Sequence, residues 1–106
     1  MPKYMFHAHY SADGARGLLR EGGTSRRTAV EAAVRSLGGT LEAFYFAFGD
    51  TDAYAIVDLP DNASAASLSL TISAGGSGAV HVTVLITPEE ADRAVRLSPA
   101  YRPPGG

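Results

Sequence analysis

The sequence contains no cysteine among its 106 residues, which excludes disulfide bonds and thiol chemistry and is typical of a reducing compartment. Its formal net charge of −2 gives no reason to expect a nucleic-acid partner. No apolar run approaches the about 20 residues that a membrane-spanning helix needs. Met1-Pro2-Lys3 leads into a strand pattern, without the apolar stretch of a secretion signal. We therefore expect a cytoplasmic protein with no nucleic-acid and no membrane partner.

Catalytic signatures are also missing. Gly75-Gly76-Ser77-Gly78 is rich in glycine, but it follows a predicted helix and lacks the lysine of a phosphate-binding loop. No serine lies in a nucleophile motif. The sequence requires no cofactor and does not decide whether the protein is an enzyme.

The hydrophobic pattern that is present predicts one small α+β domain. Strands are predicted over 3–10, 40–48, 52–59 and 79–87, and helices over 12–21, 62–74 and 88–97. A further helix is predicted to start at a Thr24 or Ser25 cap and to end near Leu37. This βαββαβ order is that of the ferredoxin-like fold, a four-stranded antiparallel sheet with helices on one face. We place the domain at 1–97 and an extended C-terminal arm at 98–106.

Strand alternation assigns each side chain to a helix-facing side or to an open side of the sheet. The residues predicted to face the helices are Tyr4, Phe6, Ala8, Tyr10, Leu41, Ala43, Tyr45, Ala47, Ala53, Ala55, Val57, Leu59, Val80, Val82, Val84 and Ile86. The open side is then predicted to carry Met5, His7, His9, Phe44, Phe46, Phe48, Tyr54, Ile56, His81 and Leu85. So apolar a side is expected to be an interaction site.

A second copy of the chain is the expected partner for this open side. At about 25 cal/mol per Å² of apolar area, covering it favours association by several kcal/mol before the cost of ordering two chains. We predict a homodimer or higher homo-oligomer whose sheets pack face to face in a dimeric α+β barrel. A cavity between the sheet and the partner is the expected place for a small apolar ligand.

The three histidines are the strongest chemical lead. His7 and His9 leave the same side of one strand with Cα atoms about 6.6 Å apart, and His81 is expected on the neighbouring strand. Three imidazoles that converge can bind a transition metal, and a single imidazole can act as a general acid or base. Interface histidines with ordinary hydrogen bonds remain the alternative.

Two groups of charged residues have both a structural and a functional explanation. Asp50 and Asp52 form a carboxylate pair in the predicted hairpin turn, where aspartate also stabilises turns; Asp52 is the catalytic candidate of the two. Arg26 and Arg27 lie at a predicted helix start, which attracts anions, although a solvated helix face explains them as well.

Several segments of the chain resemble the GYD domain family. These segments are 1–4, 21–27, 36–39, 41–49, 56–62 and 100–105. The family takes its name from a Gly-Tyr-Asp motif, which reads Gly49-Asp50-Thr51-Asp52 here, so the tyrosine is absent. The resemblance implies a ferredoxin-like, dimeric α+β-barrel type of fold and aligns Asp52 with the family's aspartate. It implies no function, because the family has no agreed catalytic residues.

Three hypotheses for the function follow from these residues. The first is a self-associating module that binds a small molecule on the open side, through His7, His9, Phe44, Phe46, Phe48, Tyr54 and His81. The second is a small monooxygenase-like or cyclase-like enzyme in which a histidine is the acid/base group or a metal ligand. The third is a structural oligomer without a ligand.

Overall fold

The structure, a computed structural model, describes residues 1–106 as four strands and four helices. In chain order these are β1 (Lys3–Tyr10), α1 (Ala12–Glu21), α2 (Gly23–Ser36), β2 (Thr40–Phe46), β3 (Ala53–Asp58), α3 (Asn62–Ala74), β4 (Gly78–Leu85) and α4 (Pro88–Arg96). The order confirms the predicted βαββαβ pattern with a trailing helix.

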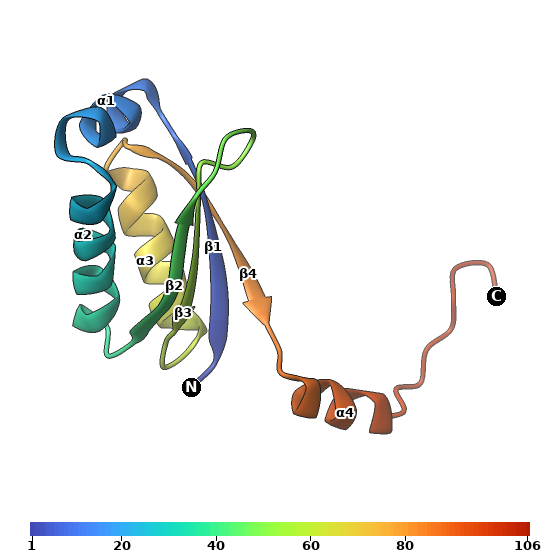
Figure 1. Cartoon of the computed structure of the whole chain (residues 1–106). Coiled ribbons are helices and arrows are strands. Elements are labelled where there is room, and N and C mark those ends of the chain that lie inside the picture. Colours follow the sequence, from blue (N-terminus) through green and yellow to red (C-terminus); the bar gives the residue numbers. More distant parts are fainter.

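The four strands form one antiparallel sheet in the order β2-β3-β1-β4. Helices α2 and α3 cover one face of the sheet, and α1 lies at its end (Figure 1). This is the ferredoxin-like arrangement that the sequence predicted. None of the helices has the length and apolar character that crossing a bilayer requires.

Side-chain caps explain where three of the helices begin. The side chains of Ser11 and Asp61 accept hydrogen bonds from backbone N–H groups in the first turns of α1 and α3. Thr87 and Glu90 form a capping box at the start of α4. The predicted Thr24 or Ser25 cap of α2 is wrong. The N-cap is Gly22, two or three residues earlier; its φ of 83° favours glycine, and it provides no side-chain cap.

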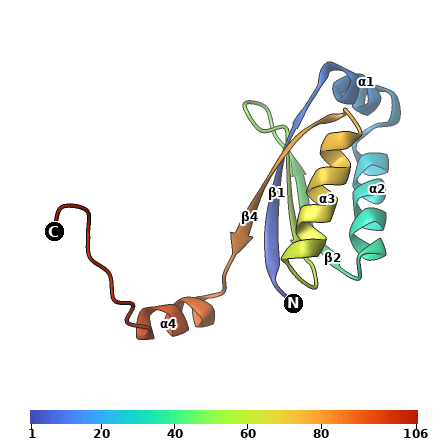
Figure 2. The same cartoon turned by 180° about the vertical axis from the view of Figure 1, so that it is seen from behind.

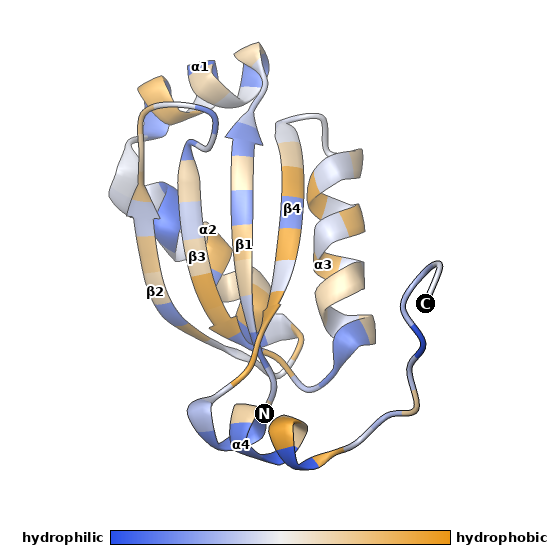
Figure 3. Ribbon diagram, turned by 90° about the vertical axis from the view of Figure 1, so that its right-hand side faces the viewer, coloured by the Kyte–Doolittle hydropathy of each residue, from blue (hydrophilic) through white to orange (hydrophobic).

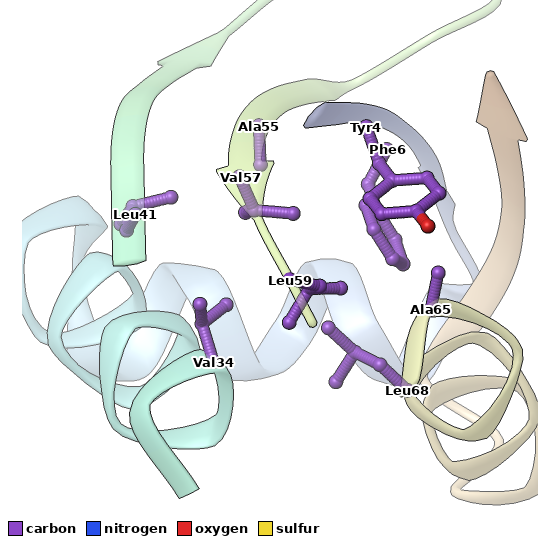
Figure 4. Close-up of a cluster of buried hydrophobic side chains, with 9 residues drawn as sticks. All are labelled: Tyr4, Phe6, Val34, Leu41, Ala55, Val57, Leu59, Ala65 and Leu68. Atoms are coloured by element: carbon purple, nitrogen blue, oxygen red, sulfur yellow. The ribbon is translucent and has the colours of Figure 1, made fainter. Parts of the chain in front are cut away.

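The hydrophobic core lies between the sheet and the α2–α3 layer (Figure 4). It consists of Tyr4, Phe6, Val34, Leu41, Ala55, Val57, Leu59, Ala65 and Leu68. The prediction for β1 and β3 is confirmed, since the sheet residues of this cluster come from the alternating sets assigned to the helices. The Tyr4 hydroxyl, deep in the core, donates to Asn62 Oδ1 at 2.6 Å and so ties β1 to α3.

The face assignment predicted for β2 is wrong beyond its first residues. Leu41 pairs with Val57, but Ala43 pairs with Ile56, so one extra residue lies in β2 at this point. Such a β-bulge reverses the alternation of the residues that follow. Phe44 and Phe46 therefore face the helices, opposite Ala55 and Ala53.

The reversal also changes the open side of the sheet. Ala43 and Tyr45, predicted to face the helices, lie there instead, opposite Ile56 and Tyr54. Figure 3 looks onto this side of the sheet, with β2, β3, β1 and β4 side by side. Its apolar residues are Met5, Ala43, Tyr45, Tyr54, Ile56 and Leu85. The open side is thus less apolar than the sequence predicted, because it lacks the phenylalanines.

A group of charges closes one end of the open side. Lys3 Nζ lies 2.8 Å from both Glu42 Oε1 and Asp58 Oδ1. The hydrogen bond to Asp58, followed by that to Glu42, raises the pKa of the Lys3 ammonium. Glu42, the extra residue at the bulge in β2, thus serves as a counter-ion to Lys3 of β1.

Helix α4 and the residues after it stand away from the rest of the molecule (Figures 1 and 2). The radius of gyration is 16.7 Å, whereas a compact chain of this length has about 13 Å. The end of β4 leaves the helical layer as well, so Val84 and Ile86, predicted to face helices, stay exposed. Val95, Leu97 and Tyr101 are exposed too, so the arm formed by α4 and the residues after it is rich in exposed apolar side chains.

Candidate functional site

A cavity lies inside the domain, between the sheet and helices α2 and α3. Its volume is about 100 Å³. The lining residues are Phe6, Ala8, Tyr10, Arg26, Val30, Ala33, Val34, Phe44, Ala53, Ala55, Val57, Leu68, Ile72, Ser77 and Val80, of which 13 are hydrophobic. Four of them are alanines. Their side chains are too small to fill the space between the sheet and the helices.

The polar groups of the cavity come from the end of the domain near α1. Tyr10 ends β1, Ser77 comes just before β4, and Arg26 lies in the first part of α2. Tyr10 pairs with Gly78 in the sheet, which brings Ser77 next to it. The cavity is therefore apolar along its length and polar at one end.

The side chains at this polar end have unused hydrogen-bonding capacity. The hydroxyl groups of Tyr10 and Ser77 have no hydrogen-bond partner in the chain. The Arg26 guanidinium approaches only Glu21, with Nη1 at 3.7 Å from Oε1, which is too far for a hydrogen bond. A ligand with acceptor oxygens would find three donors there.

Burial raises the pKa of the Tyr10 phenol, an effect that Asp52 and Glu21 strengthen and that Arg26 opposes. The phenol is consequently a neutral O–H donor at physiological pH. Three charged side chains thus act on the hydroxyl at the polar end of the cavity, and only Arg26 among them is positive.

The backbone at the start of α2 brings partial positive charge to this end. Gly22 caps the helix without a side-chain acceptor, and the first turn contains no acidic residue. A helix N-terminus without such a cap leaves N–H groups free and carries partial positive charge. Phe46 packs here against Gly23, where an added Cβ would lie 2.9 Å from the ring.

Comparison with known families finds one match, to the GYD domain over residues 4–95. The chain belongs to the GYD domain family. The match spans both layers of the domain and every residue that lines the cavity. Comparison with curated proteins finds no match, and comparison with solved structures finds none either.

The GYD domain does not bring together the seven ligand-binding residues that the sequence predicted. His7, Tyr54 and His81 do lie side by side on the open side, since His7 pairs with both of the others across the strands. The rings of His7 and Tyr54 meet edge to face with centroids 5.3 Å apart, and His7 Nε2 lies 3.3 Å from Thr83 Oγ1. These contacts fix the His7 ring on the sheet.

The three phenylalanines of the prediction lie elsewhere in the GYD domain. The rings of Phe44 and Phe46 meet edge to face on the helix-facing side, with centroids 5.1 Å apart. Only Phe44 lines the cavity. Phe48 lies in the loop between β2 and β3 and is fully exposed. Their predicted place on the open side is wrong because the bulge in β2 reverses the alternation and because β2 ends at Phe46.

The three histidines do not assemble a metal site within one GYD domain. No group of three or more His, Cys, Asp or Glu side chains is arranged to hold a metal ion. His9 instead lies close to the β2–β3 loop, with Nδ1 3.1 Å from Asp52 Oδ2, and its side chain is 64% exposed. Neither His9 nor Asp52 lines the cavity.

Asp52 connects the β2–β3 loop to the end of β1. Its Oδ2 accepts the backbone N–H of Tyr10 at 2.8 Å, and its own backbone N–H donates to Ala8 O at 2.8 Å. The aspartate that the family resemblance singled out therefore holds the strand that carries Tyr10 into the cavity. Asp50, the other carboxylate of the predicted pair, makes no hydrogen bond of this kind.

We expect Asp52→Ala to destabilise the GYD domain by about 1–3 kcal/mol, because the partly buried N–H of Tyr10 loses its acceptor. Asp52→Asn keeps an acceptor oxygen and should restore most of this loss. Urea unfolding at fixed protein concentration measures both. Equal stability of Asp52→Ala and the unchanged chain would mean that the hydrogen bond contributes nothing.

Proposed function

We propose that this GYD domain protein is a self-associating module that binds a small, largely apolar molecule in the cavity between its sheet and its helices. The observation that carries the proposal is the cavity itself, about 100 Å³ in volume and lined almost entirely by hydrophobic side chains. Well-packed interiors contain few spaces larger than a water molecule, so an apolar cavity of this size, open in part to solvent, offers room for a ligand.

The size of the cavity limits what it can hold. An engineered apolar cavity of about 150 Å³ in another protein stays dry and binds benzene or xenon. A space of about 100 Å³ accordingly suits a single ring or a short branched alkyl group, with the remainder of the ligand at the polar end. An extended or polycyclic molecule does not fit without movement of α2 or α3.

Filling the cavity tests the proposal. Ala33 lines it from α2, so Ala33→Leu places a larger side chain in the space, whereas Ala32→Leu makes the same change at the exposed neighbouring position. Benzene titrated into the labelled protein and followed by amide NMR shifts is expected to perturb cavity residues such as Val80. We expect Ala33→Leu to weaken this binding at least about tenfold and Ala32→Leu to leave it unchanged, since about 1.4 kcal/mol of lost contact corresponds to tenfold.

Two results would contradict this function. One is a benzene titration in which the amide NMR signals of the cavity residues of the unchanged protein do not shift. The other is equal binding to the Ala33→Leu and Ala32→Leu variants, which would place the ligand elsewhere. A chain that binds nothing but still self-associates would fit the structural oligomer instead.

We also propose that a second copy of the chain covers the open side of the sheet. An apolar strip that includes Met5, Tyr54 and Ile56 runs between the Lys3 charge cluster and His9, and a two-fold axis through it would bring like surfaces together. The arm supports this arrangement, because it leaves the domain on the open side of the sheet (Figure 1). A partner seated on that side would lie within its reach.

The arm itself needs such a partner. Helix α4 has only nine residues, and isolated helices of fewer than about 12–15 residues are marginal in water. It nonetheless has a complete capping box and apolar side chains that its own domain does not cover, such as Val95 and Leu97. Packing of α4 against the partner copy would supply the missing contact.

A further inference from the structure

We infer that the ligand of the cavity is a small amphipathic monoanion, namely an aromatic or branched-alkyl carboxylate whose apolar group fills the cavity and whose carboxylate lies against Arg26, Tyr10 and Ser77. This inference rests on the proposed binding function and adds the chemical class of the ligand. A purely apolar ligand would leave the donors at the polar end of the cavity unused.

The donors at the polar end match a carboxylate. A guanidinium and two hydroxyl groups offer several N–H and O–H donors, and none of the three side chains has a hydrogen-bond partner in the chain. A carboxylate has two oxygens with about four acceptor positions and accepts bidentate hydrogen bonds from arginine. A ligand ammonium group has donors only and no acceptor, so it would leave the donors of Arg26, Tyr10 and Ser77 without a partner.

The charges around Tyr10 argue against more than one negative charge on the ligand. Arg26 is the cation that acts on this hydroxyl, and the carboxylates of Glu21 and Asp52 act on it as well. A monoanion can replace the long Arg26–Glu21 contact of 3.7 Å with a closer one, whereas a phosphate dianion would be repelled by both carboxylates. The Arg26 side chain is 38% exposed, so the carboxylate keeps part of its hydration while the apolar group is buried.

Phenylacetate and its neutral amide, phenylacetamide, have nearly the same shape but differ in charge. Comparing their affinities therefore isolates the effect of the ligand's charge. We expect phenylacetate to bind the full chain at least about tenfold more tightly, a difference of about 1.4 kcal/mol that a charge-assisted hydrogen bond typically supplies. Arg26→Gln should abolish this preference, because it should weaken phenylacetate binding much more than phenylacetamide binding. Arg27→Gln makes the same charge change at the adjacent position, which does not line the cavity, and should retain the preference. Amide NMR titration gives the affinities and maps the site.

The possible results distinguish this inference from the proposed function. Equal affinity for the two ligands, with cavity residues shifted, would overturn the monoanion inference and leave the binding function intact. If Arg27→Gln removes the preference as fully as Arg26→Gln does, the attraction comes from the overall charge of α2, which also overturns the inference. If phenylacetate, phenylacetamide and benzene all leave the amide NMR signals of the cavity residues unshifted, the proposed binding function itself is wrong.

Discussion

If a second copy covers the open side as proposed, a chain with the substitution Ile56→Lys is expected to stay monomeric at concentrations at which the unchanged chain associates. Ile56 lies in the middle of the open side of the sheet, with Met5 and Ala43 as its cross-strand neighbours. A lysine there would place an unpaired ammonium group in each half of a two-fold interface, and burying an unpaired charge is costly. We expect the dimer dissociation constant to rise at least about 100-fold, which corresponds to about 2.7 kcal/mol.

Sedimentation equilibrium across micromolar concentrations measures this effect, and Ala32→Lys on the exposed surface of α2 is the matched control. A chain that ends at Thr87 shows what the arm contributes, and it should associate more weakly than the full chain if α4 packs on the partner. An unchanged chain that is monomeric throughout would disprove self-association. An Ile56→Lys dimer as stable as the original would move the interface to another surface.

Gly39→Ala is expected to destabilise the domain by about 3 kcal/mol, at the upper end of what overpacking usually costs. Gly39 lies between α2 and β2, where a Cβ would be only 2.2 Å from the carbonyl oxygen of Asp58 and 2.7 Å from Leu59 Cδ2. The chain cannot relieve this contact by moving a flexible side chain, because one of the two atoms belongs to the backbone of β3. The end of α2 would have to move away from the sheet.

Urea unfolding of Gly39→Ala, compared with Gly75→Ala, isolates this steric effect. At Gly75 an added Cβ would meet nothing closer than 3.4 Å, and φ is −71°, so alanine should be tolerated there. Both variants lose one glycine and gain one methyl group, so the unfolded chains change alike. Equal stability of the two variants would show that the α2–β2 connection adapts freely and that the α2 end is not held by this contact.

Much of the fold follows from local patterns in the sequence. The alternating apolar residues of β1 and β3 have a local physical cause, and the structure confirms their faces. The side-chain caps at Ser11, Asp61 and Thr87 are local features as well. The reversal in β2 has no such local signal. The charged Glu42 faces away from the helices, but the residue after it points the same way because two residues of β2 lie opposite Ile56.

The site was harder to predict than the fold for a related reason. A cavity is a property of packing between layers, and the small size of Ala8, Ala33, Ala53 and Ala55 matters only once these residues are known to face one another. The sequence did single out Arg26, as one of two arginines at a helix start, but did not distinguish it from Arg27. With Phe44 and Phe46 assigned to the open side, the sequence predicts a ligand site there and gives no sign of the cavity that Phe44 lines.

The bulge in β2 has a consequence for alignments of this family. Odd-numbered residues of β2 face the helices before Glu42 and the open side after it. Aromatic positions of this strand therefore cannot be compared between proteins by counting residues from one end. In a relative that lacks the extra residue, the positions aligned with Phe44 and Tyr45 exchange environments while the strand keeps almost the same length. A one-residue gap placed at the wrong point in this strand would therefore make a cavity residue look like an interface residue.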